Sequence, residues 1–137
     1  MKKSVVSVLV AAVAMIATAI ALGYLFSFLF PSMNTEYENS AIYRPWNDPL
    51  MYLFILQPFV LTGMLVWGWN KLKDHFTGSA GRKALDISLI MLFLSIIPGM
   101  LMSISTFKVS VLAIITWTIS AFVQVWVSSL IFVKINE

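Results

Sequence analysis

Side chains of the types that do chemistry are few in this sequence, and most lie in one short polar segment. Residues 31–49 hold three carboxylates, two phenols and one guanidinium, but no histidine or cysteine: Glu36, Glu38, Asp48, Tyr37, Tyr43 and Arg44. Two glutamates at a spacing of two do not share a helical face, and no nucleophile stands beside a base. We therefore expect no enzymatic activity and no catalytic residue.

Metal, cofactor and nucleic-acid sites are also not expected. His75 is the single histidine and the chain has no cysteine, whereas a metal site needs several ligands at suitable spacing. The net charge is +3, but the basic residues lie at the ends of apolar runs instead of forming a patch that could follow a nucleic acid. Asp86 is expected to pair locally with Arg82 or Lys83.

The elements that carry these residues are dictated by apolar composition. The 137 residues are 60% hydrophobic and 11% charged, against roughly 45–50% and about 25% in soluble domains. Four apolar runs are each long enough to cross a hydrocarbon core of about 30 Å as a helix. The sequence predicts one all-α integral membrane domain, residues 1–137, a four-transmembrane-helix bundle with helices at about 4–30, 50–70, 84–106 and 109–133.

Lysine and arginine predict the orientation. Seven would lie on one side and two on the other, and the richer side is cytoplasmic by the positive-inside rule. Both termini and the loop 71–83 are then cytoplasmic, the loop 31–49 is external, and the protein lies in the plasma or inner membrane. The seven are Lys2, Lys3, Lys71, Lys73, Arg82, Lys83 and Lys134, and the two are Arg44 and Lys108.

Local signals support these boundaries. Asp48 before Pro49 predicts the N-cap and first turn of the second helix. Trp67 and Trp69 are expected in an aromatic belt at the inner interface.

Polar groups and helix breakers inside the predicted spans mark where a ligand could bind. Gln57 lies beside Pro58 in the second span, and Pro98 beside Gly99 in the third. A proline in a helix frees a carbonyl and bends the axis, and the two prolines lie at similar depth from the outer side. These four residues are the candidate ligand site, a small cavity open outward. Kinks filled by neighbouring helices are the alternative interpretation.

Small and polar residues recur at helical spacing on the last two spans and predict contact faces. Such seams let helices approach closely and bond across the contact. They serve either the bundle's own packing or a second subunit. The residues are Ser95 and Ser103 on the third span, and Thr116, Ser120, Gln124 and Ser128 on the fourth.

Two functions stay open. The first is a structural or accessory subunit, or an oligomeric scaffold, in a membrane complex, with the lipid bilayer and a membrane protein or a second copy as partners. The second is a binding or conduction module for a lipid, quinone or other apolar molecule near Pro58 and Pro98. A coupled transporter is disfavoured, because no ionisable side chain lies at mid-span.

Overall fold

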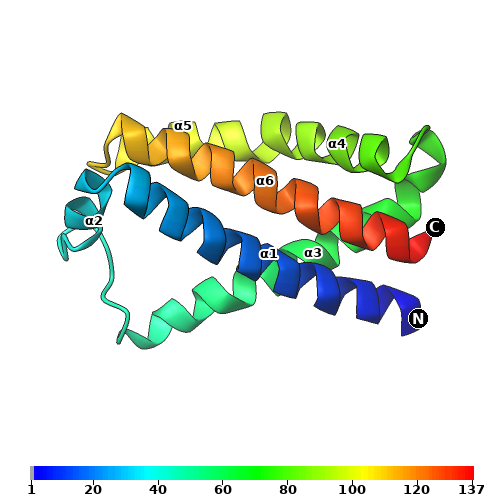
Figure 1. Ribbon diagram of the computed structural model, residues 1–137, viewed down its shortest axis with the longest axis horizontal. Helices are drawn as coiled ribbons and strands as arrows, with labels where there is room; N and C mark the ends of the chain where they lie inside the picture. Colours follow the sequence, from blue (N-terminus) through cyan, green and yellow to red (C-terminus); the bar gives the residue numbers. More distant parts are fainter. Residues whose placement is uncertain (1) are drawn as a thin grey trace.

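Four long helices side by side make up the chain (Figure 1). The computed structural model describes residues 2–137, and within them there is no β-strand. The third long helix consists of three consecutive parts, α4, η3 and α5. The elements are α1 (Lys2–Leu29), α2 (Ser32–Tyr37), η1 (Pro49–Met51), α3 (Tyr52–Leu72), η2 (Lys73–His75), α4 (Ala80–Met91), η3 (Leu92–Ile96), α5 (Ile97–Thr106) and α6 (Val111–Asn136).

The prediction of four apolar helices is confirmed. Each long helix, together with its short flanking turns, is 26 or 27 residues long. This length and its hydropathy suit a membrane crossing. Both chain ends and the η2 turn lie at one end of the bundle, which we call the terminal end. The other end, which we call the distal end, carries α2 and the connection from α5 to α6 (Figure 1).

Several helix ends differ from the ends of the apolar runs, because capping groups, and not hydropathy alone, determine where a helix starts. The third helix begins at Ala80 instead of residue 84, since Ser79 is its N-cap and accepts a hydrogen bond from the Arg82 N–H at 3.4 Å. Gly78 precedes the cap with a φ of 95°, a conformation that favours glycine. At the start of η1, Asp48 Oδ1 accepts from the Leu50 N–H at 2.9 Å, which confirms the predicted cap.

The two prolines within the long helices have different local consequences. Pro58 lies inside α3, which stays α-helical around it. Pro98 lies in the first turn of α5, directly after η3, a π-helical turn. A wider turn gives room to the proline ring and to the carbonyl that lacks its usual donor. The third helix is therefore irregular at the position the sequence indicates, while the second stays α-helical even though Pro58 has no N–H to donate to the Phe54 carbonyl.

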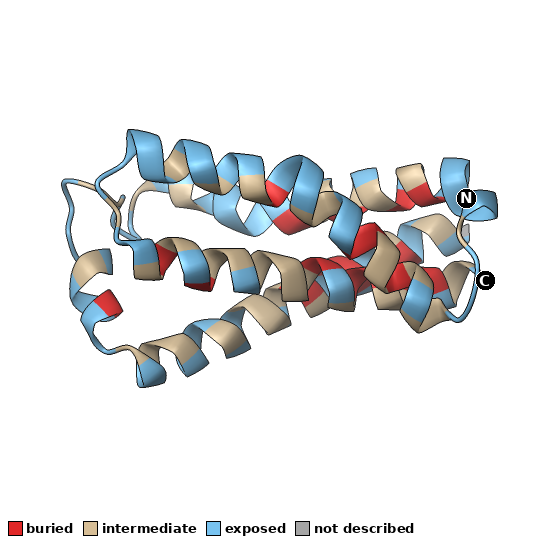
Figure 2. Ribbon diagram, turned by 90° about the horizontal axis from the view of Figure 1, so that it is seen from above, coloured by how far each residue is buried: buried red, intermediate tan, exposed pale blue. Residues whose placement is uncertain are grey.

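The core lies toward the terminal end. There α6 packs between α1 and α4, and α1 also contacts α3. Figure 2 shows most of the buried residues gathered in this half of the bundle. Their main cluster joins all four long helices through Ala11, Val66, Trp69, Ile87, Phe132 and Val133.

Toward the distal end α3 departs from the bundle. In Figure 1 its first turns stand well away from α1 and α6. All six residues from 52 to 57 are exposed, although the Trp46 ring meets Phe54 edge to face with centroids 6.0 Å apart. We call residues 52–57 the free segment of α3.

Candidate functional site

The polar segment at the distal end is a structural cap. It contains a short helix, α2, that the sequence reasoning missed; Pro31 at its start is the one signal that could have indicated it. The Glu36 carboxylate accepts two hydrogen bonds from Ser110, one from the backbone N–H at 2.8 Å and one from the hydroxyl at 2.6 Å. Ser110 is itself the N-cap of α6. Glu36 therefore fixes α2 to the start of α6.

An aromatic cluster closes the same cap. Trp117 Nε1 on α6 donates to the Tyr37 hydroxyl at 2.9 Å. The Tyr37 and Tyr43 rings meet edge to face, with centroids 5.4 Å apart, and Tyr43 meets Trp117 in the same way at 6.3 Å. These contacts suit aromatic pairs. We call Glu36, Tyr37, Tyr43, Ser110 and Trp117 the distal cap.

The electrostatics of this region favour a structural role. Burial and the nearby Glu36 carboxylate raise the pKa of Tyr43 to about 12. Burial also raises the pKa of Tyr37. The backbone bond from Leu50 lowers the pKa of Asp48, and the bond from Arg44 adds to this. Both phenols stay protonated at neutral pH. The Asp48 carboxylate is engaged by the hydrogen bonds from the Leu50 N–H and from Arg44.

The four candidate ligand residues are not brought together. Gln57 is exposed and Pro58 is buried on α3, while Pro98 and Gly99 are exposed on α5. The main contacts of α3 are with α1, whereas those of α5 are with η3 and α6. At the distal end the two helices lie on different sides of α1 and α6 (Figure 1). The two prolines therefore do not form a common cavity wall in this arrangement.

The candidate contact residues divide between packing and exposure. On α6, Thr116 and Ser128 are buried within the chain, and Ser120 and Gln124 are half-buried. On the third helix Ser95 is exposed, and Ser103 is half-buried with its hydroxyl bonded to the Gly99 carbonyl at 2.9 Å. The α6 seam thus contributes to the chain's own packing at its two ends.

At the terminal end two pairs of charged groups contact each other. Arg82 Nε lies 3.1 Å from the Asp86 carboxylate, which confirms the expected local pair, and Lys83 pairs with Glu137. His75 is exposed in η2. Among residues 2–137, no group of three histidine, cysteine or acidic side chains is placed to hold a metal ion.

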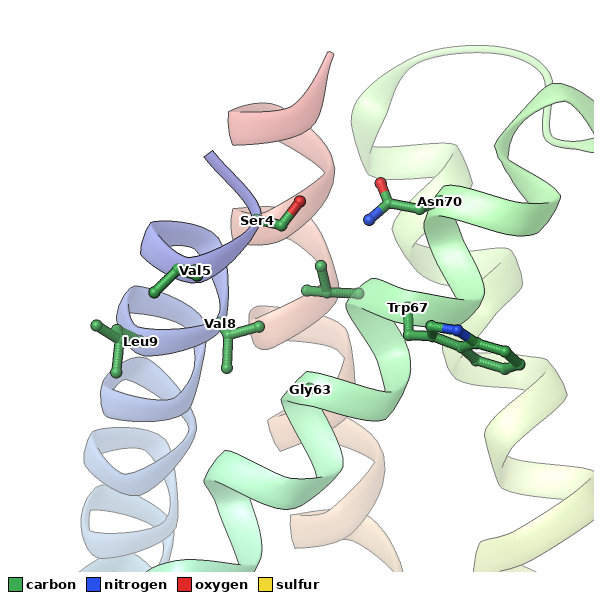
Figure 3. Close-up of a pocket in the computed structure, with 8 residues that line it drawn as sticks. Ser4, Val5, Val8, Leu9, Gly63, Trp67 and Asn70 are labelled. Atoms are coloured by element: carbon green, nitrogen blue, oxygen red, sulfur yellow. The ribbon is translucent and has the colours of Figure 1, made fainter. Parts of the chain in front are cut away.

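Two features could not be predicted from the sequence, because they depend on the angles between the helices. One is the free segment of α3. The other is a groove between α1 and α3 in the terminal half, lined by Val5, Val8 and Gly63 among others (Figure 3). Helix periodicity does not encode the angle between helices, so no single-sequence signal marks either one.

The four long helices are long and apolar enough to cross a membrane, which suits a multi-pass helical membrane protein. Comparisons with protein-family models, curated proteins and solved structures found no match to this chain.

Proposed function

We propose that this chain is an accessory or scaffold subunit that assembles in the plasma or inner membrane through the free segment of α3. In this proposal the terminal end is cytoplasmic. Support comes from the charge distribution: seven of the nine lysines and arginines lie at that end, beside both termini and η2, as the positive-inside rule requires.

The free segment is the observation that carries the proposal. Tyr52, Leu53 and Phe54 are 75, 58 and 61% exposed, and Ile55 and Leu56 are each 54% exposed. A helix that belongs to a bundle usually covers one of its faces against a neighbour. Here all six side chains are exposed and the Trp46 ring touches one of them, Phe54, so a helix from another chain can pack beside the remaining surface without displacing any part of this one.

Gln57 gives this surface a specific polar contact. Its side chain is exposed on α3 and lies eight residues, or about 12 Å, below the start of η1 at Pro49, hence well inside the hydrocarbon. A primary amide in lipid needs a hydrogen-bond partner to offset its desolvation. Amides of this kind join transmembrane helices at about 1 kcal/mol each.

The second function expected from the sequence, an apolar-ligand module near Pro58 and Pro98, has less support. It needs both prolines at one cavity, and α3 and α5 diverge at that end (Figure 1).

Cross-linking in native membranes tests the assembly proposal. The chain has no cysteine, so single-cysteine variants can be compared directly. Leu53→Cys, in the free segment, should cross-link to a second chain or to another protein. The matched control Leu101→Cys is 64% exposed on α5 near the distal end and should give little product. Equal yields at both positions would show that the contact is random collision.

A second variant tests the polar contact. Gln57→Leu keeps the apolar surface but removes the amide. At about 1 kcal/mol for the lost contact we expect roughly fivefold weaker association in mild detergent, measured as a shift toward the single chain by size-exclusion chromatography with light scattering over a dilution series. Ser105→Ala, an exposed polar change on α5, should leave the complex intact. A wild-type chain that is monomeric in native nanodiscs would overturn the proposal.

A further inference from the structure

A second groove, with a volume of about 400 Å³, lies on the surface of α3 alone. Its lining residues are Leu53, Leu56, Gln57, Val60, Leu61 and Met64. They form two overlapping sets of four at positions i, i+3, i+4 and i+7, which are 53, 56, 57 and 60, then 57, 60, 61 and 64. Four residues at this spacing form the hole that receives one side chain of a facing helix in knobs-into-holes packing. The groove is therefore lined in the pattern that a second helix fills.

Four of these residues form one exposed row, which we call the outer row: Leu53, Gln57, Val60 and Met64. The three apolar members are 58, 54 and 66% exposed, and Gln57 is exposed as well. Spacings of four, three and four place all four within about 60° around the helix axis. The residues that α3 buries lie on the opposite side, and they are Pro58, Thr62, Val66 and Trp69. The outer row therefore faces away from the rest of the chain, at the 3.5-residue repeat that keeps two helices in contact over several turns.

The polar residue of the outer row indicates which helix fills the groove. Copies of one membrane protein insert with the same orientation, so a twofold axis along the membrane normal places each residue at the same depth in both copies. A glutamine amide has two N–H donors and one carbonyl acceptor. Gln57 and Gln57 of the partner subunit therefore satisfy each other with two reciprocal hydrogen bonds. A different protein needs a polar group of its own at this depth, whereas a second copy supplies it by symmetry.

We propose that two copies of this chain form a parallel dimer in which the outer rows of their α3 helices face each other. The apolar residues of each row enter the groove of the other copy, and the paired Gln57 amides fix the register, as a single polar residue does in an apolar seam. The inference rests on the assembly proposed above and names its partner.

The charged residues nearest to the outer row are compatible with this arrangement. Before α3, Arg44 pairs with Asp48 at 2.9 Å, so this charge is neutralised within each copy. Lys71 lies seven residues, or about 10 Å, beyond Met64 and is exposed in the last turn of α3. There its long side chain extends into water, so two copies of Lys71 do not have to approach each other.

Disulfide formation under mild oxidation in native membranes tests which face of α3 is in contact. Val60→Cys, in the outer row, should give a covalent product of twice 15.4 kDa. The matched control is Ile55→Cys, which is 54% exposed, as Val60 is. Ile55 lies two residues from Leu53 and hence on the opposite side of the helix. It should give little product, because a disulfide needs Cα atoms about 4.4–6.8 Å apart.

Competition between tagged copies tests whether the partner of Gln57 is Gln57 itself. A wild-type chain with one tag is co-expressed with equal amounts of wild-type and Gln57→Leu chains that carry two other tags. Purification through the first tag should recover roughly fivefold more wild type than variant, the ratio for one unsatisfied amide contact of about 1 kcal/mol. Ser105→Ala in place of Gln57→Leu is the control and should be recovered as well as wild type. Circular dichroism establishes that each variant is folded.

Three outcomes would overturn the inference. One is an equal disulfide yield at Val60→Cys and Ile55→Cys, and another is equal recovery of the wild-type and Gln57→Leu copies. The third is that no tagged copy recovers another, which would leave the groove to lipid or to a different protein. In that case a product of Leu53→Cys with a different mass keeps the assembly proposal and removes only the dimer. The absence of any product at Leu53→Cys removes both.

Discussion

The two halves of the bundle are held together by different physics. In the terminal half, side chains from all four long helices meet in one apolar cluster, with Phe132 fully buried and Trp69 only 4% exposed. In the distal half, hydrogen bonds and aromatic contacts fix α2 to α6, and α3 stands free. The terminal half therefore determines the fold, and the distal half leaves one helix available.

This difference fits a lipid environment. Between helices in lipid there is little hydrophobic driving force, so close packing and polar contacts decide which helices associate. The terminal half supplies packing by combining small residues such as Ala11 and Ala84 with the large Phe132. At the distal end α3 carries large side chains such as Tyr52 and Phe54, and no row of small residues on a neighbouring helix faces them. This part of α3 therefore lies apart from the bundle.

The largest expected effect comes from breaking the terminal cluster. Phe132→Ala should reduce the free energy of unfolding by about 3–5 kcal/mol, because it removes a fully buried ring that packs 6.3 Å from the Trp69 ring, centroid to centroid. Thermal unfolding in detergent, followed by circular dichroism, measures the loss.

Phe28→Ala is the control for that comparison. Phe28 is 82% exposed on the distal part of α1, so its removal should change stability by less than about 0.5 kcal/mol. If the two variants were equally destabilised, the distal half would contribute as much packing as the terminal half, and the contrast between them would not hold.

The elements of the fold could be predicted from the sequence to a large extent. Long apolar runs predict helices because lipid leaves the backbone no other partner, and Asp48 with Pro49 indicates the start of the second one. Trp67 and Trp69 show the limit. Both were expected in an interfacial belt. Trp67 is 68% exposed, as such a position requires, whereas Trp69 is in the core, because only the packing of α3 on α1 and α6 decides which one turns inward.

The candidate site could be predicted much less well. Gln57, Pro58, Pro98 and Gly99 were grouped by depth alone, and depth does not say which helices are neighbours. The distal cap was missed for a related reason. Glu36 and Ser110 are 74 residues apart, so their contact exists only once α2 and α6 are placed in space.

A smaller effect is expected from weakening the distal cap. Glu36→Ala removes the acceptor of both Ser110 hydrogen bonds and should cost about 1 kcal/mol, since the contact is exposed. Hydrogen exchange of the backbone amides at the start of α6 should become faster. Glu38→Ala, an exposed neighbour, should leave that exchange unchanged. An equally slow exchange in the Glu36 variant would mean that the aromatic contacts alone hold the cap.

The smallest effect near neutral pH is expected at Tyr43, whose ionisation should destabilise the fold only at high pH. The Tyr43 hydroxyl is buried, with no hydrogen-bond partner among residues 2–137, so Tyr43→Phe should alter stability by less than about 0.5 kcal/mol. Its pKa is raised from 10.0 to about 12 by burial, Glu36 and Tyr37. A raised pKa means that the folded state holds the proton more tightly than the unfolded state. The contribution to stability is therefore complete below pH 10 and is lost as pH rises toward 12.

Titration of wild type and Tyr43→Phe side by side isolates the contribution of Tyr43 ionisation to stability. Unfolding temperatures in detergent should fall for both proteins as pH rises above 10, because Tyr37 also has a raised pKa. The fall should be smaller in the variant, which lacks one of the two late-titrating phenols. Identical pH profiles would show that Tyr43 ionises without opposing the fold, and that the distal cap is looser in solution than its aromatic contacts indicate. The terminal cluster, which contains no tyrosine, should be unaffected in either protein until the cap has opened.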